Sequence, residues 1–229
     1  MGTILASAVI DKASVQLLDV GNTRWSRAEL LGWLNDGQRQ IVLMSPHTNN
    51  KTAVVQLATG TRQTLPADGW KLLDVIRYMG NTSTPKPGRA IRIISESLLN
   101  AYNPNWHNAK TSDIPQNYIF DPQEQTAFYV YPPNTGCGRV LINYTAVPAD
   151  LASEESPIEV NDIYQTALLD YILYRANSKD AEYAPGLQLA SGYFSTFMAS
   201  MGIRKDADTE NNPNQGLSAT QRMAPGGES

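Results

Sequence analysis

The sequence is poor in the residues on which most enzymes and metal proteins depend. It has one cysteine, Cys137, and two histidines, His47 and His107. A single cysteine excludes an intramolecular disulfide and every zinc site built on two or more cysteines. The sequence therefore predicts no metal and no cofactor, and it suits a reducing cytoplasm.

Positive charge and long apolar runs are also scarce. Eighteen basic residues against 22 acidic ones give a formal charge of -4, which argues against a protein whose main task is to grip nucleic-acid phosphates. No signal peptide is recognisable, and no apolar run approaches the roughly 18 residues of a membrane span. Only 17% of the residues are charged, against about 25% in an average soluble domain. We expect no membrane partner, and we expect part of the surface to be covered by other proteins.

Catalytic motifs are missing as well. There is no G-x-S-x-G nucleophile elbow and no phosphate-binding glycine loop, and GCGRV at 136–140 lacks the third glycine of a dinucleotide fingerprint. Cys137 lies between two glycines in a predicted hairpin turn. Glu154 and Glu155 precede Pro157 in a predicted loop, where a solvated surface is the simpler explanation. The sequence predicts no catalytic residues.

Helical periodicity marks the first 50 residues. Residues 3–19 contain no proline or glycine and predict a helix. Ser26 and Glu29 form a capping box at the start of a second helix. Its apolar stripe consists of Leu30, Leu34, Gly37, Ile41 and Met44. A glycine on such a stripe costs about 1 kcal/mol relative to alanine, so we expect a neighbouring helix to approach closely at Gly37.

The middle of the chain has short apolar runs separated by turn residues, which predict strands. The runs are AVVQLA, KLLDVIRYM, AIRII, YIFD, AFYVYPP and VLINYTAVP, with a short helical turn at SESLLNAYNP. In the last run, alternation of Val140, Ile142, Tyr144 and Ala146 with more polar residues predicts one buried face. The absence of long crossover segments favours a mostly antiparallel sheet.

Two further helices follow, and a polar tail ends the sequence. One helix begins at Asn161 and carries the stripe Tyr164, Leu168, Tyr171 and Ile172; the next carries Leu187, Ala190, Phe194, Phe197 and Met201, with Gly202 as its expected terminator. The tail, 203–229, has few apolar residues and cannot bury a core of its own. It predicts either a disordered terminus or an arm that becomes ordered on a partner.

The predicted fold class is α+β. Two N-terminal and two C-terminal helices form an antiparallel bundle, a β-rich and mostly antiparallel insertion interrupts it, and an extended C-terminal arm follows. The predicted boundaries are 1–50 for the N-terminal helices, 51–157 for the insertion, 158–202 for the C-terminal helical hairpin and 203–229 for the arm.

One ordered succession of segments runs from the first helices to about residue 201. It consists of TRWSRAELLGWLNDGQRQIVLMSP, TLPADGWKLLDVIRYMG, GRAIRIISESLLNAYNPNWH, YIFDPQEQTAFYVYPP, INYTAVPADL and DIYQTALLDYILYRANSKDAEYA. In this order the segments resemble the head-to-tail adaptor (connector) proteins of tailed bacteriophages. The resemblance implies a structural virion protein without catalytic residues.

The resemblance also implies binding partners and a location in the virion. About a dozen copies would close into a homo-oligomeric ring through heterologous contacts, below the portal protein and above a tail or nozzle protein. Viral DNA would pass through the lumen without sequence-specific binding, at the portal vertex between head and tail, after assembly in the host cytoplasm. Family members reach the portal through C-terminal extensions, which makes the tail the expected portal interface: Ile203, Arg204, Leu217, Arg222 and Met223.

Two other functions stay open on the sequence alone. A DNA-binding module of the packaging machinery would need a basic face, and the candidate cations gather around the insertion: Arg62, Lys71, Arg77, Lys86, Arg89 and Arg92. A small hydrolase would have to use His47 or His107 with Cys137 or a serine.

Overall fold

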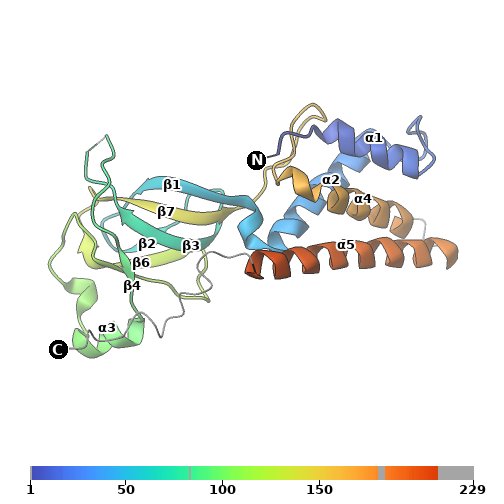
Figure 1. The fold of residues 1–229 in the computed structure, drawn as a ribbon. Coiled ribbons are helices and arrows are strands. Elements are labelled where there is room, and N and C mark those ends of the chain that lie inside the picture. The colour runs from blue at the N-terminus through green and yellow to red at the C-terminus, as the bar shows by residue number, and fades with distance from the viewer. Residues whose placement is uncertain (1, 83, 180–183, 211–229) are drawn as a thin grey trace, which may run out of the picture. The chain divides into compact units, whose positions relative to one another are not determined.

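The computed structural model in Figure 1 describes residues 2–82, 84–179 and 184–210; of 184–185 and 203–210 it describes the backbone. The chain divides into two compact units. The β unit consists of Pro46–Asp150 and Glu159–Asn161; the helical unit consists of Gly2–Ser45, Leu151–Ile158 and the described residues from 162 onward. The two units have different secondary structure, so the predicted α+β class is confirmed.

Two sheets form the β unit. Its elements are η1 Pro46–Asn49, β1 Asn50–Gln56, β2 Gly60–Thr64, β3 Gly69–Tyr78, β4 Arg92–Ile93, α3 Glu96–Tyr102, η2 Trp106–Asn108, β5 Asn117–Ile119, β6 Ala127–Asn134 and β7 Arg139–Ala146. The strand orders are β1-β7-β3 and β2-β6-β5-β4. All the pairs are antiparallel except β4 with β5, so the expected mostly antiparallel topology is confirmed.

Both sheets contribute to one hydrophobic core. Val75 of β3, Phe128 of β6 and Ile142 of β7 are fully buried in it. On β7 the predicted alternation holds, but Thr145 is buried too, and its hydroxyl is satisfied there by donating to the carbonyl of Pro46 at 3.0 Å. The sequence patterns missed β2, whose residues GTRQT are polar and pair with β6.

The helical unit contains α1 Ala6–Gln16, α2 Arg27–Met44, η3 Asp162–Tyr164, α4 Gln165–Lys179 and α5 Ala184–Glu210. Helix α4 packs against the other three long helices, and α5 lies along it (Figure 1). The expected antiparallel order of a four-helix bundle stays a prediction.

Gly37 explains how α2 meets α4. A Cβ atom at this position would lie 3.1 Å from Cδ1 of Tyr171 and 3.2 Å from Cδ2 of Leu168. These distances are tighter than ordinary van der Waals contact, so the absent side chain is what admits the α4 side chains. The close approach expected from the sequence is confirmed.

The start of α2 has the serine half of the expected capping box. The Ser26 hydroxyl accepts a hydrogen bond from the backbone N–H of Glu29 at 3.3 Å. The Glu29 carboxylate, in turn, accepts from Nζ of Lys179 at the end of α4. Glu29 thereby contributes to a contact between α2 and α4.

The predicted end of the last helix is wrong. Helix α5 passes through Gly202 and continues to Glu210. Glycine ends a helix when it adopts a positive φ, whereas Gly202 keeps a helical backbone, and the following residues RKDADTE include good helix formers. The expected extended arm therefore does not begin at 203, and residues 211–229 lie outside the described part of the chain.

Candidate interaction surfaces

The residues that could carry hydrolase chemistry are not arranged as a catalytic group. His107 stacks on Trp106 with ring centroids 3.6 Å apart, and its Nδ1 is 2.9 Å from the hydroxyl of Thr61. Cys137 is an exposed thiol in the turn between β6 and β7. In the part of the chain that the structure describes, no hydrogen bond joins Cys137 to either histidine, and no group of three or more His, Cys, Asp or Glu residues could hold a metal ion.

His47 lies beside a small pocket of about 250 Å³ in the β unit. The lining is mostly apolar and includes Lys71, Ile93 and Tyr118. The Tyr118 hydroxyl donates to Asp74 at 2.9 Å, and burial raises the pKa of this phenol well above its usual range. Because the phenol stays protonated at neutral pH, the pocket offers no tyrosinate base.

The most unusual surface of the helical unit is on α5. From Ala184 to Ile203 the sequence has no charged residue and no histidine. A surface helix normally presents charged residues on the face opposite the core. No helix in the described ranges has the combination of length and hydropathy that a membrane span requires.

Only one stripe of α5 is buried. Ala190, Phe197 and Met201 are at most 4% exposed, and the Phe197 ring lies 5.4 Å from that of Tyr171 on α4. Leu187 and Phe194 belong to the same predicted stripe but are 54% and 36% exposed. The expectation that the whole stripe enters the core is therefore right for three of its five residues.

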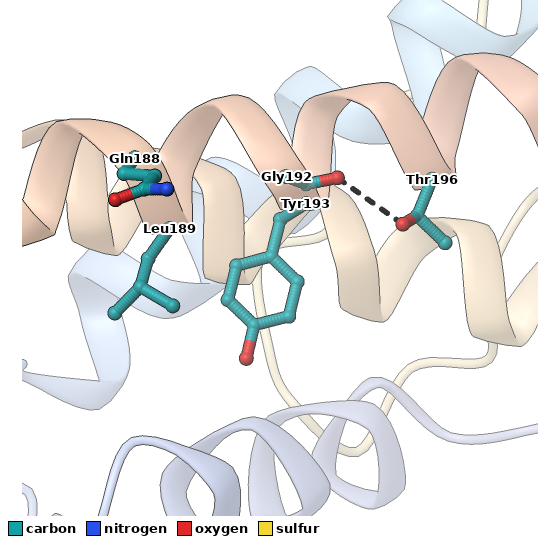
Figure 2. Close-up of a pocket in the computed structure, with 5 residues that line it drawn as sticks. All are labelled: Gln188, Leu189, Gly192, Tyr193 and Thr196. Atoms are coloured by element: carbon teal, nitrogen blue, oxygen red, sulfur yellow. Dashed lines mark hydrogen bonds between the residues drawn. The ribbon is translucent and has the colours of Figure 1, made fainter.

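Exposed apolar side chains lie on both sides of the buried stripe. Together with the half-buried Tyr193 they form what we call the α5 apolar surface: Leu187, Leu189, Tyr193, Phe194 and Met198. Leu189 and Tyr193 line a pocket of about 570 Å³ together with Gln188, Gly192 and Thr196. Figure 2 shows the Leu189 and Tyr193 side chains extending from the same side of the helix, while Thr196 donates to the carbonyl of Gly192 at 3.1 Å.

A second apolar surface of the helical unit lies in the turn that joins α1 to α2. Leu18 and Val20 are 93% and 73% exposed. Leu18 has φ of 56°, a left-handed conformation that is unfavourable for a bulky side chain. Such strain persists only where the surroundings enforce it, and it is common at functional positions.

Asp19 holds this turn in shape. Its carboxylate accepts hydrogen bonds from the backbone N–H groups of Thr23, Arg24 and Trp25, all at 2.8–2.9 Å. These donors, with that of Trp25 first among them, lower the pKa of the Asp19 carboxyl. The exposed leucine and valine are therefore presented on a preorganised turn, which the sequence patterns missed because the residues match no helix or strand period.

The six candidate DNA-binding cations differ in their surroundings. Arg62 forms an ion pair with Glu124, and Lys71 lines the pocket beside His47. Within the described residues, Arg77, Lys86, Arg89 and Arg92 form no ion pair. These four lie on or next to the connection between β3 and β4.

The predicted portal residues are outside the region where side chains are described. Ile203 and Arg204 belong to the helical backbone of α5. The other three, Leu217, Arg222 and Met223, lie beyond the described residues. Their assignment stays a prediction.

Comparison with known proteins identifies the family. A search of curated proteins found no match to this chain. The family model described as SU10 adaptor protein matches residues 5–219, which include every helix and strand given above. The chain therefore belongs to the SU10 adaptor family of phage head-to-tail adaptor proteins.

Proposed function

We propose that this phage structural protein is a ring-forming adaptor that connects the portal to the tail and continues the DNA channel. The observation that carries the proposal is the family match over residues 5–219. An adaptor acts by geometry, so its residues serve contacts with the portal protein, the tail protein and further copies of itself.

Lateral contacts between copies are supported by the two apolar surfaces of the helical unit. A closed ring needs heterologous contacts, in which one surface of a copy meets a different surface of the next. The α5 apolar surface includes a pocket, whereas Leu18 and Val20 protrude from a fixed turn. In our proposal the turn of one copy packs on α5 of its neighbour, which covers an uncharged surface that would otherwise face water.

Contact with the portal is assigned to the C-terminal tail, with Leu217, Arg222 and Met223 as its candidate residues. The tail begins directly after α5, whose helix ends at Glu210. A polar segment with few apolar residues gains order from a partner rather than from a core of its own.

The first test is the mass of the complex with the portal ring of the same phage, measured by light scattering. The full chain is compared with a truncation after Glu210, which leaves α5 intact. We expect a stoichiometric complex with the full chain and its loss on truncation. A complex that survives truncation would move the portal contact to the folded units, and absence of any complex would contradict the adaptor role.

The second test addresses lateral contact. Leu189→Lys with Tyr193→Lys places two charges on the α5 apolar surface, and we expect the copies bound per portal to fall. The matched control, Leu43→Lys with Leu98→Lys, charges two exposed leucines at other places, which are 58% and 48% exposed. Equal losses in both variants would contradict the assignment of α5.

A further inference from the structure

A segment of the β unit carries an isolated positive charge. Residues 75–95 contain four cations, Arg77, Lys86, Arg89 and Arg92, and no acidic residue. The rest of the β unit has five basic and eight acidic residues, a formal charge of -3. The four positive charges are therefore concentrated in one stretch of an otherwise acidic unit.

The described backbone of this segment, 75–82 and 84–95, forms a hairpin. The N–H of Tyr78 donates to the carbonyl of Arg89 at 2.9 Å, that of Gly88 to Tyr78 at 2.8 Å, and that of Lys86 to Met79 at 3.0 Å. We call the described residues 76–82 and 84–92 the cationic hairpin. It rises from the sheet between β3 and β4 in Figure 1.

The base of the hairpin is attached to β7 and to the core. Met79 and Gly80 exchange backbone hydrogen bonds with Arg139, at 2.7 and 3.0 Å, and Ile91 is only 6% exposed. At Gly88 a Cβ would lie 3.1 Å from the Tyr78 ring, so the ring packs directly on the glycine backbone. The cations are thus carried on a preorganised support rather than on a loose loop.

The four cations form no ion pair within the described part of the protein. Lys86, Arg89 and Arg92 are exposed and Arg77 is half-buried. Elsewhere in the same unit cations are paired, as Lys51 is with Asp68 and Arg62 with Glu124. Unpaired cations gathered on one projection create a local positive potential that suits an anionic partner.

One carboxylate does lie near the base of the hairpin. Asp113 accepts a hydrogen bond from Asn81 at 3.2 Å and another from the hydroxyl of Thr135. These two donors, Thr135 first, lower the pKa of the Asp113 carboxyl, so it is charged at neutral pH. Its charge offsets at most one of the four cations.

The composition of the hairpin distinguishes between anionic partners. The sequence at 80–88, GNTSTPKPG, has small polar residues and two prolines, and it has no other apolar and no aromatic side chain. Protein interfaces usually contain a large apolar or aromatic side chain as an anchor, and segments that bind a membrane surface insert such a side chain into it. Phosphate backbones are instead held by Lys and Arg together with small hydroxyl and amide donors.

We propose that the cationic hairpin contacts the phosphate backbone of duplex DNA without reading its sequence. This inference rests on the proposed function, because an adaptor that continues the DNA channel has the duplex as its neighbour. A few cations per copy give a weak contact that releases the duplex easily, while repetition around a ring multiplies the number of contacts.

The test measures binding of the full chain to a fluorescent duplex of mixed sequence, by anisotropy over a series of salt concentrations. The variant is Lys86→Gln with Arg89→Gln, two exposed positions. The slope of log K against log salt should become shallower by about 0.9 for each lost contact, and affinity at low salt should fall about tenfold. A second duplex of unrelated sequence should give the same values.

The matched control is Lys51→Gln with Arg62→Gln, which removes the same two charges from ion-paired positions of the same unit. It should keep the wild-type slope. An equal loss in the control, or no binding of the wild-type chain at low salt, would overturn the proposal. So would hairpin-dependent binding that is tighter to phosphatidylserine vesicles or to polyglutamate than to the duplex.

The portal experiment separates this inference from the proposed function. A complex with the portal but no duplex binding would leave the adaptor role standing and remove the hairpin contact. Hairpin-dependent duplex binding without any portal complex would contradict the adaptor role and leave the hairpin as a nucleic-acid contact.

Discussion

The β unit and the helical unit differ in how they expose charge. The β unit has nine basic and eight acidic residues, a formal charge of +1, and the rest of the chain has nine basic and fourteen acidic residues, a formal charge of -5. Yet the long helix α5 of the acidic unit has twenty consecutive residues without any charge. The formal charge of a whole chain therefore says little about the surface that a partner meets, because the sum does not show where charged and uncharged stretches lie.

The same comparison extends to how the units are held together. In the β unit two sheets enclose one core of interlocking side chains from five strands and the loops between them. In the helical unit α4 is the central element, and the contact at Gly37 depends on the lack of a side chain. The first arrangement is sensitive to the removal of volume, and the second to its addition.

The largest effect is expected from removing volume in the β unit. Phe128→Ala deletes a ring that is fully buried in the shared core and should destabilise the unit by about 3 to 5 kcal/mol. Hydrogen exchange measured by mass spectrometry should show faster exchange in β3, β6 and β7, with α2 and α4 unchanged. An equal increase in exchange rate in both units would show that they unfold together, and it would contradict the difference in stability that we draw between them.

An intermediate effect is expected from adding volume in the helical unit. Gly37→Leu forces a side chain against Tyr171 and Leu168 and should cost about 1 to 3 kcal/mol. Gly32→Leu is the matched control on the same helix, since nothing lies within 4 Å of a Cβ there, and it should be neutral or stabilising through helix propensity. The melting temperatures of the two variants are compared by thermal unfolding. Equal values would contradict the explanation that Gly37 is needed for a close helix contact.

These particular residues also show what the sequence could predict. Gly37 interrupted an apolar stripe, so its role in helix contact followed from periodicity alone, as did the burial of Leu30, Leu34 and Ile41. The strands with alternating or continuous apolar residues were also predicted, whereas β2 was not. A polar strand is specified by its partner rather than by its own pattern.

Surfaces were harder to predict than cores. The periodicity of α5 correctly placed Ala190, Phe197 and Met201 inside, but the exposure of Leu187 and Phe194 depends on how few neighbours the helix has. Which cations stay unpaired likewise depends on the register of distant segments, as Arg62 and Glu124 show. Sequence patterns identify apolar and charged residues, whereas tertiary contacts decide which of them remain available to a partner.

The smallest effect concerns a carboxylate buried in the helical unit. Asp170 of α4 is 9% exposed, and its Oδ2 has no hydrogen-bond partner among the described residues. Burial raises the pKa of the Asp170 carboxyl above its ordinary value of 3.8. Between the unfolded and folded pKa values the folded state therefore holds more protons, so the free energy of unfolding decreases as pH rises through this window.

Asp170→Asn removes the charge while keeping the size of the side chain. At neutral pH the variant should melt at a higher temperature than the wild type, because the folded protein no longer buries an unpaired charge. The difference should shrink as pH falls below the ordinary value of 3.8, because the wild-type carboxyl then becomes protonated in both states. Asp36→Asn serves as the control, since that carboxylate is 39% exposed and pairs with Arg39, and it should give no such gain. A gain for Asp170→Asn that did not depend on pH would mean that a contact of the Asn amide, rather than the loss of a buried charge, stabilises the variant, because the two side chains have the same size.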